Sequence, residues 1–267
     1  MTIFRETSEL ARVNRDAHPG PVVVGRELFD LLALCEQLHR DTDCAFDVTS
    51  TPLSRCWGFL RREGRLPAPD EIADARAAVG MQHVQLDRRR QGVSFDRPGM
   101  ALNLGAIGKG HALDRIGGLL QGRGVKRALL SAGCSSLLAS GGGTDPWRVD
   151  LRSAVTSEVL ARVYLARGAV GTSGAGEQFC EVDGVRYGHV IDPRSGWPAT
   201  GVLSASVIAI DAASADALST AFLIGGPALA QRYCSKHPDV LALITPDDGS
   251  RHPMMFGSYP EARVTAK

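Results

Sequence analysis

Residues 179–190 read FCEVDGVRYGHV and contain the strongest local signal for the fold. Asp183 and Gly184 separate two short runs that are rich in strand-forming residues. Both residue types tolerate the positive φ angles that a two-residue hairpin turn requires. The segment therefore predicts two antiparallel strands joined by a tight turn.

The segments on either side of this hairpin extend the pattern of short strands and separate helices. Apolar residues alternate strictly along 159–165, which is typical of a half-buried strand. Further strands are expected at 125–131, 147–151, 202–210 and 240–245. Helices are expected, from apolar spacing and from flanking glycines and prolines, at 27–41, 70–79, 107–122, 214–224 and 227–236. Antiparallel strands with segregated helices predict an α+β fold.

Two of these helices carry more detailed expectations. Asp70 is expected to cap the helix at 70–79, which follows two prolines. The helix beginning near Ile107 is expected to turn one apolar face to the core, formed by Ile107, Leu113, Ile116 and Leu120. Because no composition shift marks a boundary, residues 1–267 are expected to form a single domain.

Composition narrows the class of protein. The 267 residues carry 30 basic and 29 acidic side chains without an obvious basic face, so no nucleic-acid partner is expected. No apolar stretch is long enough for a transmembrane helix, and the first residues lack the pattern of a signal peptide. The chain as written is consistent with a cytoplasmic protein, but the compartment is left open. The six cysteines lack CxxC spacing, so a zinc site is not expected.

A glycine-rich segment, ALNLGAIGKGHALDR at 101–115, contains the expected start of a helix. Free N–H groups and the helix dipole at such a turn attract phosphate, and Lys109 adds a positive charge. The segment does not match the Walker pattern, and an ordinary turn is the alternative interpretation.

Two polar patterns suggest chemistry. Asp216 and Thr220 are four residues apart, so on a helix they share one face and offer the hard oxygen atoms that Mg²⁺ prefers. The alternative is that Asp216 only interacts with the helix dipole. His189 lies near the end of a predicted strand and can accept a proton near neutral pH, although a lone histidine is more often an ordinary polar residue. Asp192 would either orient its ring or brace the following turn.

Two further segments have open interpretations. The stretch GTSGAGEQF at 171–179 is either a ligand-binding loop or an ordinary bulge. Trp57 and Phe59, which follow the segment AFDVTSTPLSR at 45–55, belong either to the core or to an aromatic pocket.

Six segments in this order resemble the ApbE family, and the resemblance spans almost the whole chain. They are SELARVNR (8–15), AFDVTSTPLSRCWGF (45–59), LNLGAIGKGHALDRI (102–116), GTSGAGEQF (171–179), YGHVIDPRSGWP (187–198) and ADALSTAFLIGG (215–226). The resemblance implies a T-fold-like α+β domain and an FAD:protein FMN transferase. Such an enzyme splits FAD at its pyrophosphate with the help of Mg²⁺, attaches FMN to a threonine of a client flavoprotein and releases AMP. The alternatives are an FAD-binding protein without transfer activity and an FAD pyrophosphatase that yields FMN and AMP.

The resemblance also implies roles for individual residues. FAD contacts are expected at Phe4, Ala45, Phe46, Asp47, Asn103, Lys109 and Ile191, with the adenosine diphosphate end beside residues 103–110. The magnesium site matches the carbonyl group of Ala106 together with Asp216 and Thr220. His189 takes the position of the base that deprotonates the client threonine, and Asp216 is its partner in catalysis.

This chain departs from the family pattern at a few positions. Asn103 stands where the family typically has an aspartate, and Phe4 stands where a tyrosine usually precedes the SEL motif. The segment at 131–135 differs from the commoner version with asparagine and aspartate. The chain is also short at its N-terminus relative to the family, whose members often act outside the cytoplasmic membrane. These differences affect the prediction of transfer activity more than that of FAD binding.

Overall fold

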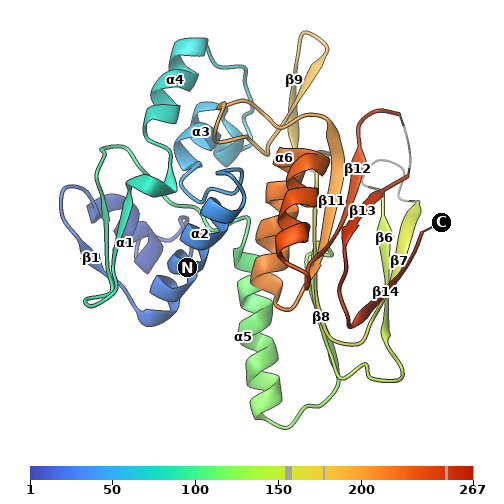
Figure 1. Ribbon diagram of the computed structural model, residues 1–267. Helices are drawn as coiled ribbons and strands as arrows, with labels where there is room; N and C mark the ends of the chain where they lie inside the picture. The colour runs from blue at the N-terminus through green and yellow to red at the C-terminus, as the bar shows by residue number, and fades with distance from the viewer. Residues whose placement is uncertain (154–157, 177, 250–251, 267) are drawn as a thin grey trace. The chain divides into compact units, whose positions relative to one another are not determined.

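The computed structural model describes residues 1–153, 158–176, 178–249 and 252–266 (Figure 1). The chain divides into two compact units. Unit 1 comprises Met1–Gly105 and Gln178–Pro198, and unit 2 comprises Ala106–Glu177 and Ala199–Lys267. The sequence-based expectation of a single domain stays a prediction.

Unit 1 combines short helices with a small antiparallel sheet and a separate hairpin. Its helical segments are α1 (Glu9–Asp16), α2 (Arg26–Asp41), α3 (Thr51–Cys56), η1 (Phe59–Arg61), α4 (Pro69–Ala77) and η2 (Met81–His83). Its sheet has the order β1-β3-β2, formed by Val22–Val23, Gly92–Phe95 and Val84–Asp87. The hairpin pairs β9 (Phe179–Val182) with β10 (Val185–Gly188).

The core of unit 1 includes an aromatic cluster. Trp57 is fully buried, and its indole N–H donates to the carbonyl oxygen of Gly196 at 2.9 Å. The Trp57 ring lies 5.4 Å from that of Tyr187 and 6.3 Å from that of Phe59. Of the two interpretations that the sequence left open, Trp57 and Phe59 therefore belong to the core.

Unit 2 is built in layers. A six-stranded sheet has the order β13-β12-β11-β8-β5-β4, and a three-stranded sheet has the order β14-β7-β6. Apolar side chains of both sheets form one core cluster, while helices α5 (Gly108–Gly122) and α6 (Ala212–Lys236) lie on the other side of the six-stranded sheet (Figure 1). The strands are β4 (Ala128–Ala132), β5 (Ser136–Ser140), β6 (Trp147–Arg152), β7 (Val159–Leu165), β8 (Gly168–Gly174), β11 (Val202–Ala209), β12 (Leu241–Pro246), β13 (Met254–Gly257) and β14 (Ala262–Ala266).

Several local expectations are confirmed. Asp183 and Gly184 form the hairpin turn with φ angles of 52° and 77°. In β7 every second residue from Ala161 to Leu165 is buried, as the alternation predicts. The two helices expected at 214–224 and 227–236 are parts of α6, separated at Gly226, whose φ of 67° breaks the helix before Pro227. The α+β prediction is therefore confirmed.

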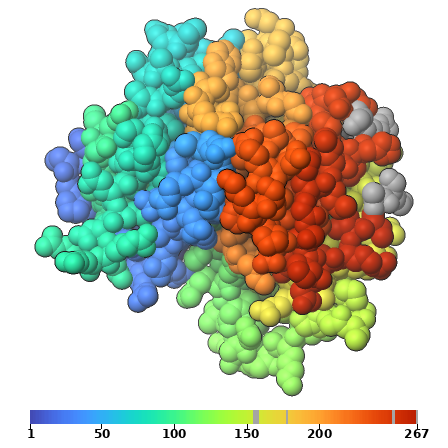
Figure 2. Space-filling view, in the orientation of Figure 1, coloured from blue at the N-terminus to red at the C-terminus, as the bar shows by residue number. Residues whose placement is uncertain are grey.

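The apolar face predicted for α5 is partly wrong. Ile107 and Leu113 are buried, but the side chain of Ile116 is 45% exposed. Gly110 and Gly117 face the interior instead, because a Cβ atom at Gly110 would lie 2.0 Å from the Ala212 carbonyl oxygen. Close contact made by glycines cannot be recognised by counting large apolar residues. The later part of α5 lies at the surface of unit 2 (Figure 2, green).

Three other expectations need correction. Helix α4 starts at Pro69, one residue before the proposed cap Asp70, and Glu71 accepts the N–H of Ala68 at 2.9 Å. The glycines at 171–174 belong to strand β8 and not to a loop. The strand expected at 125–131 begins only at residue 128. None of the helices in the described part of the chain has the length and apolar character needed to span a bilayer.

Candidate active site

Asp216 is a buried carboxylate on α6 in unit 2, with only 2% of its surface exposed. Its Oδ1 atom accepts a hydrogen bond from Ser136 Oγ at 3.0 Å and lies 3.3 Å from Lys109 Nζ. Its Oδ2 atom accepts the N–H of Gly110 at 3.1 Å. Burying a carboxylate whose oxygen atoms lack partners is costly, so these contacts compensate for its burial and fix its orientation.

Two other carboxylates fix the start of α6. Asp211 accepts the N–H of Ser214 at 2.7 Å, and Asp114, from α5, accepts the N–H groups of Ala212 and Ala213 at 2.8 and 2.9 Å. Acidic side chains at this end satisfy unpaired N–H groups and suit the helix dipole. Burial raises the pKa of Asp114, and the two N–H donors oppose this shift. The first turn of α6, which leads to Asp216, is thereby anchored to α5.

Glycines allow this turn to lie close to its neighbours. A Cβ atom at Gly110 would lie 2.0 Å from the carbonyl oxygen of Ala212, and one at Gly171, on β8, would lie 2.3 Å from that of Ala215. Both distances are far below van der Waals contact, and both involve backbone atoms of α6. Helix α5 and strand β8 therefore approach α6 closely on either side of Asp216.

We predict that Gly110→Ala lowers the free energy of unfolding by about 1–3 kcal/mol, because the new methyl group must push the backbone of α6 away. Gly118→Ala is the matched control, because it lies on the same helix and has no atom within 4 Å of the added carbon. This control should raise stability by up to about 1 kcal/mol, since alanine favours helix. Urea unfolding of both variants tests the prediction, and equal stabilities would contradict it.

Hydroxyl groups continue the polar site along α6. Thr220 Oγ1 lies 3.1 Å from Ser173 Oγ on β8, which in turn lies 2.8 Å from Ser219 Oγ. Ser219 Oγ donates to the backbone oxygen of Asp216 at 2.8 Å. Asp216 and Thr220 thus belong to one connected polar group, as their spacing on a helix predicts.

The oxygen atoms of this group suit Mg²⁺. Asp216 offers a carboxylate and Thr220 a hydroxyl, and Ala106, two residues before α5, offers a backbone carbonyl. Mg²⁺ is commonly bound through one or two carboxylates and other oxygen ligands. The ammonium group of Lys109 already lies beside Asp216 Oδ1, so a positive charge is accommodated at this point. No cluster of three or more His, Cys, Asp or Glu side chains that could hold a metal occurs within the described residues.

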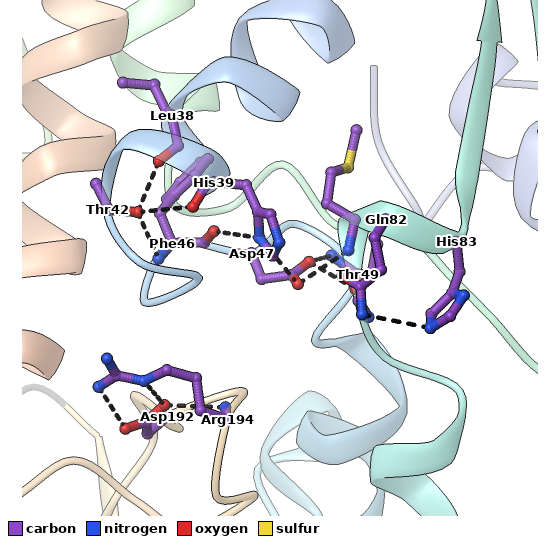
Figure 3. A network of polar contacts seen from close by, with 12 residues as sticks. Leu38, His39, Thr42, Phe46, Asp47, Thr49, Gln82, His83, Asp192 and Arg194 are labelled. Carbon is purple, nitrogen blue, oxygen red and sulfur yellow. Dashed lines mark hydrogen bonds and ion pairs between the residues drawn. The ribbon is translucent and has the colours of Figure 1, made fainter.

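The segment Ala45–Asp47 lies in unit 1 and begins four residues after the end of α2. Ala45 and Phe46 are buried. Asp47 Oδ1 accepts the N–H of Thr49 at 2.8 Å, and Oδ2 accepts that of Met81 at 3.1 Å and lies 3.2 Å from His39 Nδ1 (Figure 3). The three residues stay predicted FAD contacts, while both carboxylate oxygens of Asp47 are already bound inside unit 1.

The other predicted FAD contacts are differently placed. Asn103 lies beside the segment, because its N–H donates to the carbonyl oxygen of Val48 at 2.7 Å. Ile191 packs in an apolar cluster that includes Trp57, and the side chain of Phe4 is 78% exposed. Lys109 belongs to unit 2 and contacts Asp216. Within unit 1, the structure thus brings Asn103 beside the residue that follows Asp47.

His189 follows β10 directly. Its N–H donates to the carbonyl oxygen of Gln178 at 2.9 Å, and its Nδ1 atom lies 3.1 Å from the same oxygen. Because a carbonyl oxygen only accepts, Nδ1 carries a proton, and Nε2 is the nitrogen that can accept one when the ring is neutral. Asp192 accepts from Arg194 Nε at 2.8 Å and Nη2 at 2.7 Å, so it braces the turn and does not orient His189.

Sequence reasoning singled out neither Ser136 nor Ser173, although Ser173 lies in the candidate segment at 171–179. Ser136 and Ser173 lie on neighbouring strands β5 and β8 and contact Asp216 and Thr220. The runs of small hydroxyl residues that contain them were the only signal in the sequence. Their position beside α6 depends on the pairing of distant strands.

Fold and site together define an α+β protein whose buried carboxylate and hydroxyl groups form an oxygen-rich site at the start of a long helix. A profile of the ApbE family matches residues 1–244, and the chain belongs to the ApbE family. It is 34% identical over 241 residues to an FAD:protein FMN transferase of Klebsiella pneumoniae. This alignment covers 87% of this chain and 69% of that relative. It is 29% identical over 276 residues to the Escherichia coli K12 protein of the same name, covering 100% and 78% of the two chains.

Solved structures agree with this assignment. The ApbE protein of Thermotoga maritima superposes with a TM-score of 0.86 at 31% identity, covering 96% of this chain and 83% of that one. The flavin transferase ApbE of Vibrio cholerae superposes with a TM-score of 0.81 at 27% identity, covering 97% and 83%. The predicted family and its mainly antiparallel α+β architecture are confirmed.

Proposed function

We propose that this protein is an FAD:protein FMN transferase that depends on Mg²⁺, attaches FMN to a threonine of a client flavoprotein and releases AMP. As a member of the ApbE family the protein is a transferase, and its relatives are named for FMN transfer from FAD. The observation that carries the proposal is the buried Asp216 carboxylate, held between Lys109, Ser136 and the N–H of Gly110.

Asp216, Thr220 and the carbonyl group of Ala106 are the proposed ligands of Mg²⁺. When bound, the ion neutralises negative charge on the FAD pyrophosphate and on the departing phosphate, as phosphoryl transfer requires. Ser136 and Gly110 hold the carboxylate in one orientation, and Lys109 adds a second positive charge beside it. Such preorganised charge is a large contribution to catalysis in general.

His189 is the proposed base. Its Nε2 lone pair removes the proton from the client threonine while the threonine oxygen attacks the phosphorus atom on the FMN side of the pyrophosphate. The new P–O bond joins FMN to threonine, and the P–O bond to AMP breaks. Nδ1 keeps its proton and donates it in a hydrogen bond to the carbonyl oxygen of Gln178, which favours the tautomer that accepts at Nε2.

Incubation of the protein with FAD, Mg²⁺ and a candidate client, followed by mass spectrometry of the client, tests the proposal. We expect one FMN group on a threonine, an equal amount of AMP, and neither product when EDTA removes the metal. Release of FMN and AMP without a client would instead indicate an FAD pyrophosphatase. FAD that stays bound and intact in the presence of a client that another FMN transferase modifies would indicate an FAD-binding protein without transfer activity. Either of these two results would overturn the proposal.

A further inference from the structure

The C-terminal end of α2 binds both polar backbone groups of Phe46, through His39 in its last turn and through Thr42, the C-cap that follows it. His39 Nδ1 lies 3.0 Å from the carbonyl oxygen of Phe46, and Thr42 Oγ1 accepts the N–H of Phe46 at 3.2 Å (Figure 3). Both side chains are buried, with His39 6% and Thr42 0% exposed. Two side chains from the end of one helix therefore fix the peptide groups on both sides of Phe46.

The same two side chains are themselves held in place. Thr42 Oγ1 donates to the carbonyl oxygen of Leu38 at 2.6 Å, so its donor and acceptor functions are both used. His39 Nδ1 also lies 3.2 Å from Asp47 Oδ2, and Asp47 is bound on its other side by Thr49. Every link in this group runs through a buried polar atom, where an unpaired group is costly.

We propose that His39 and Thr42 are positioning residues for FAD: they hold the segment Ala45–Asp47 in the shape that binds the flavin nucleotide. This inference rests on the proposed function and on the FAD contacts that the resemblance to the ApbE family implies for this segment. The physical reason is preorganisation, because a loop that is already fixed loses less conformational freedom when the ligand binds. Neither residue needs to touch the ligand.

The charge state of His39 gives this role a pH signature. Burial alone lowers the pKa of His39, but the hydrogen bond and charge of Asp47, together with the Phe46 carbonyl, raise it above its ordinary value. The other groups facing this pair are the side chain of Gln82 and the thiols of Cys35 and Cys44. Burial, followed by the charge of Asp47, raises the pKa of both thiols, so they stay neutral at neutral pH.

The direction of the pH effect follows from this raised pKa. The ion pair with Asp47 is complete below the ordinary histidine pKa of about 6.5 and is lost as the pH rises through the higher value of the folded protein. The segment at 45–47 is therefore held most firmly at low pH. We expect the affinity for FAD to decrease as the pH rises above the ordinary histidine pKa of about 6.5.

The test is the dissociation constant of FAD, measured by titration calorimetry on the full chain at increasing pH. Thr42→Val and His39→Ala should each weaken FAD binding about tenfold, the effect expected from losing the one hydrogen bond that each side chain makes to the backbone of Phe46. Thr42→Ser keeps the hydroxyl and should bind like the wild type. His39→Asn offers an amide donor near the position of Nδ1 but cannot titrate, so its affinity should not vary with pH.

His18→Asn is the matched control. Its Nδ1 atom also lies beside a backbone carbonyl oxygen in unit 1, at 3.2 Å from that of Phe95, and it should be replaceable without effect on FAD affinity or its pH dependence. A wild-type chain that does not bind FAD would overturn the proposed function itself. If the wild type binds FAD, two results would overturn the positioning role: unchanged affinity in Thr42→Val, or the wild-type pH dependence in His39→Asn. These two measurements, on Thr42→Val and on His39→Asn, decide the question even if His39→Ala fails to fold.

Discussion

Asp216→Ala is expected to reduce the rate of FMN transfer by on the order of 10²–10³-fold, the usual effect of removing a preorganised charge from an active site. Asp216 supplies the only charged group among the three proposed magnesium ligands. Its removal also leaves Lys109 without the carboxylate that lies 3.3 Å away, and it leaves Ser136 without an acceptor. The substitution therefore removes a proposed metal ligand and, at the same time, the partner that holds Lys109 and Ser136 in place.

Two comparisons separate this effect from unfolding. Asp216→Asn keeps the size of the side chain and one acceptor oxygen but loses the charge, so it should fold and still be nearly inactive. Asp145→Ala removes an 87% exposed carboxylate of unit 2, paired with Arg127, and should transfer FMN at the wild-type rate. The rate should be measured with Mg²⁺ at saturating and limiting concentrations. Transfer by Asp216→Asn at near wild-type rate would show that the metal assignment is wrong.

The parts of the fold that could be predicted from the sequence are those that local patterns determine. The turn at Asp183 and Gly184 forms because both residues adopt positive φ angles, and no distant contact is needed for this preference. The break at Gly226 and Pro227 is equally local. Alternation along 159–165 also predicted β7, because one face of that strand packs in the core between the two sheets.

The parts that could not be predicted depend on contacts between distant segments. Asp216 and Ser136 are 80 residues apart, and only the packing of α6 against β5 and β8 brings their oxygen atoms within 3.0 Å. Ile116 was expected to be buried because it is large and apolar, whereas α5 packs through Gly110. In the same way, nothing in the local sequence indicated that His39 binds the backbone of Phe46.

His189→Ala is expected to lower FMN transfer by about 10²–10⁴-fold, which is the usual contribution of general-base catalysis. A threonine hydroxyl is a weak nucleophile at neutral pH, so removal of its proton determines how readily it attacks phosphorus. The binding of FAD should be nearly unchanged, because the proposed role of His189 is toward the client and not toward the nucleotide. Transfer and FAD affinity should therefore be measured on the same preparation.

His189→Asn makes this prediction sharper. The asparagine amide can still donate to the carbonyl oxygen of Gln178, which lies 3.1 Å from Nδ1 in the wild type, but it has no counterpart of the Nε2 lone pair. The turn after β10 should stay intact while the base is lost, so this variant should be as slow as His189→Ala. Added imidazole should restore part of the activity of His189→Ala by supplying a free base. If His189→Asn transfers FMN to an accepted client at near wild-type rate, the assignment is wrong, and Asp216 or an ordered water molecule becomes the better candidate for the base.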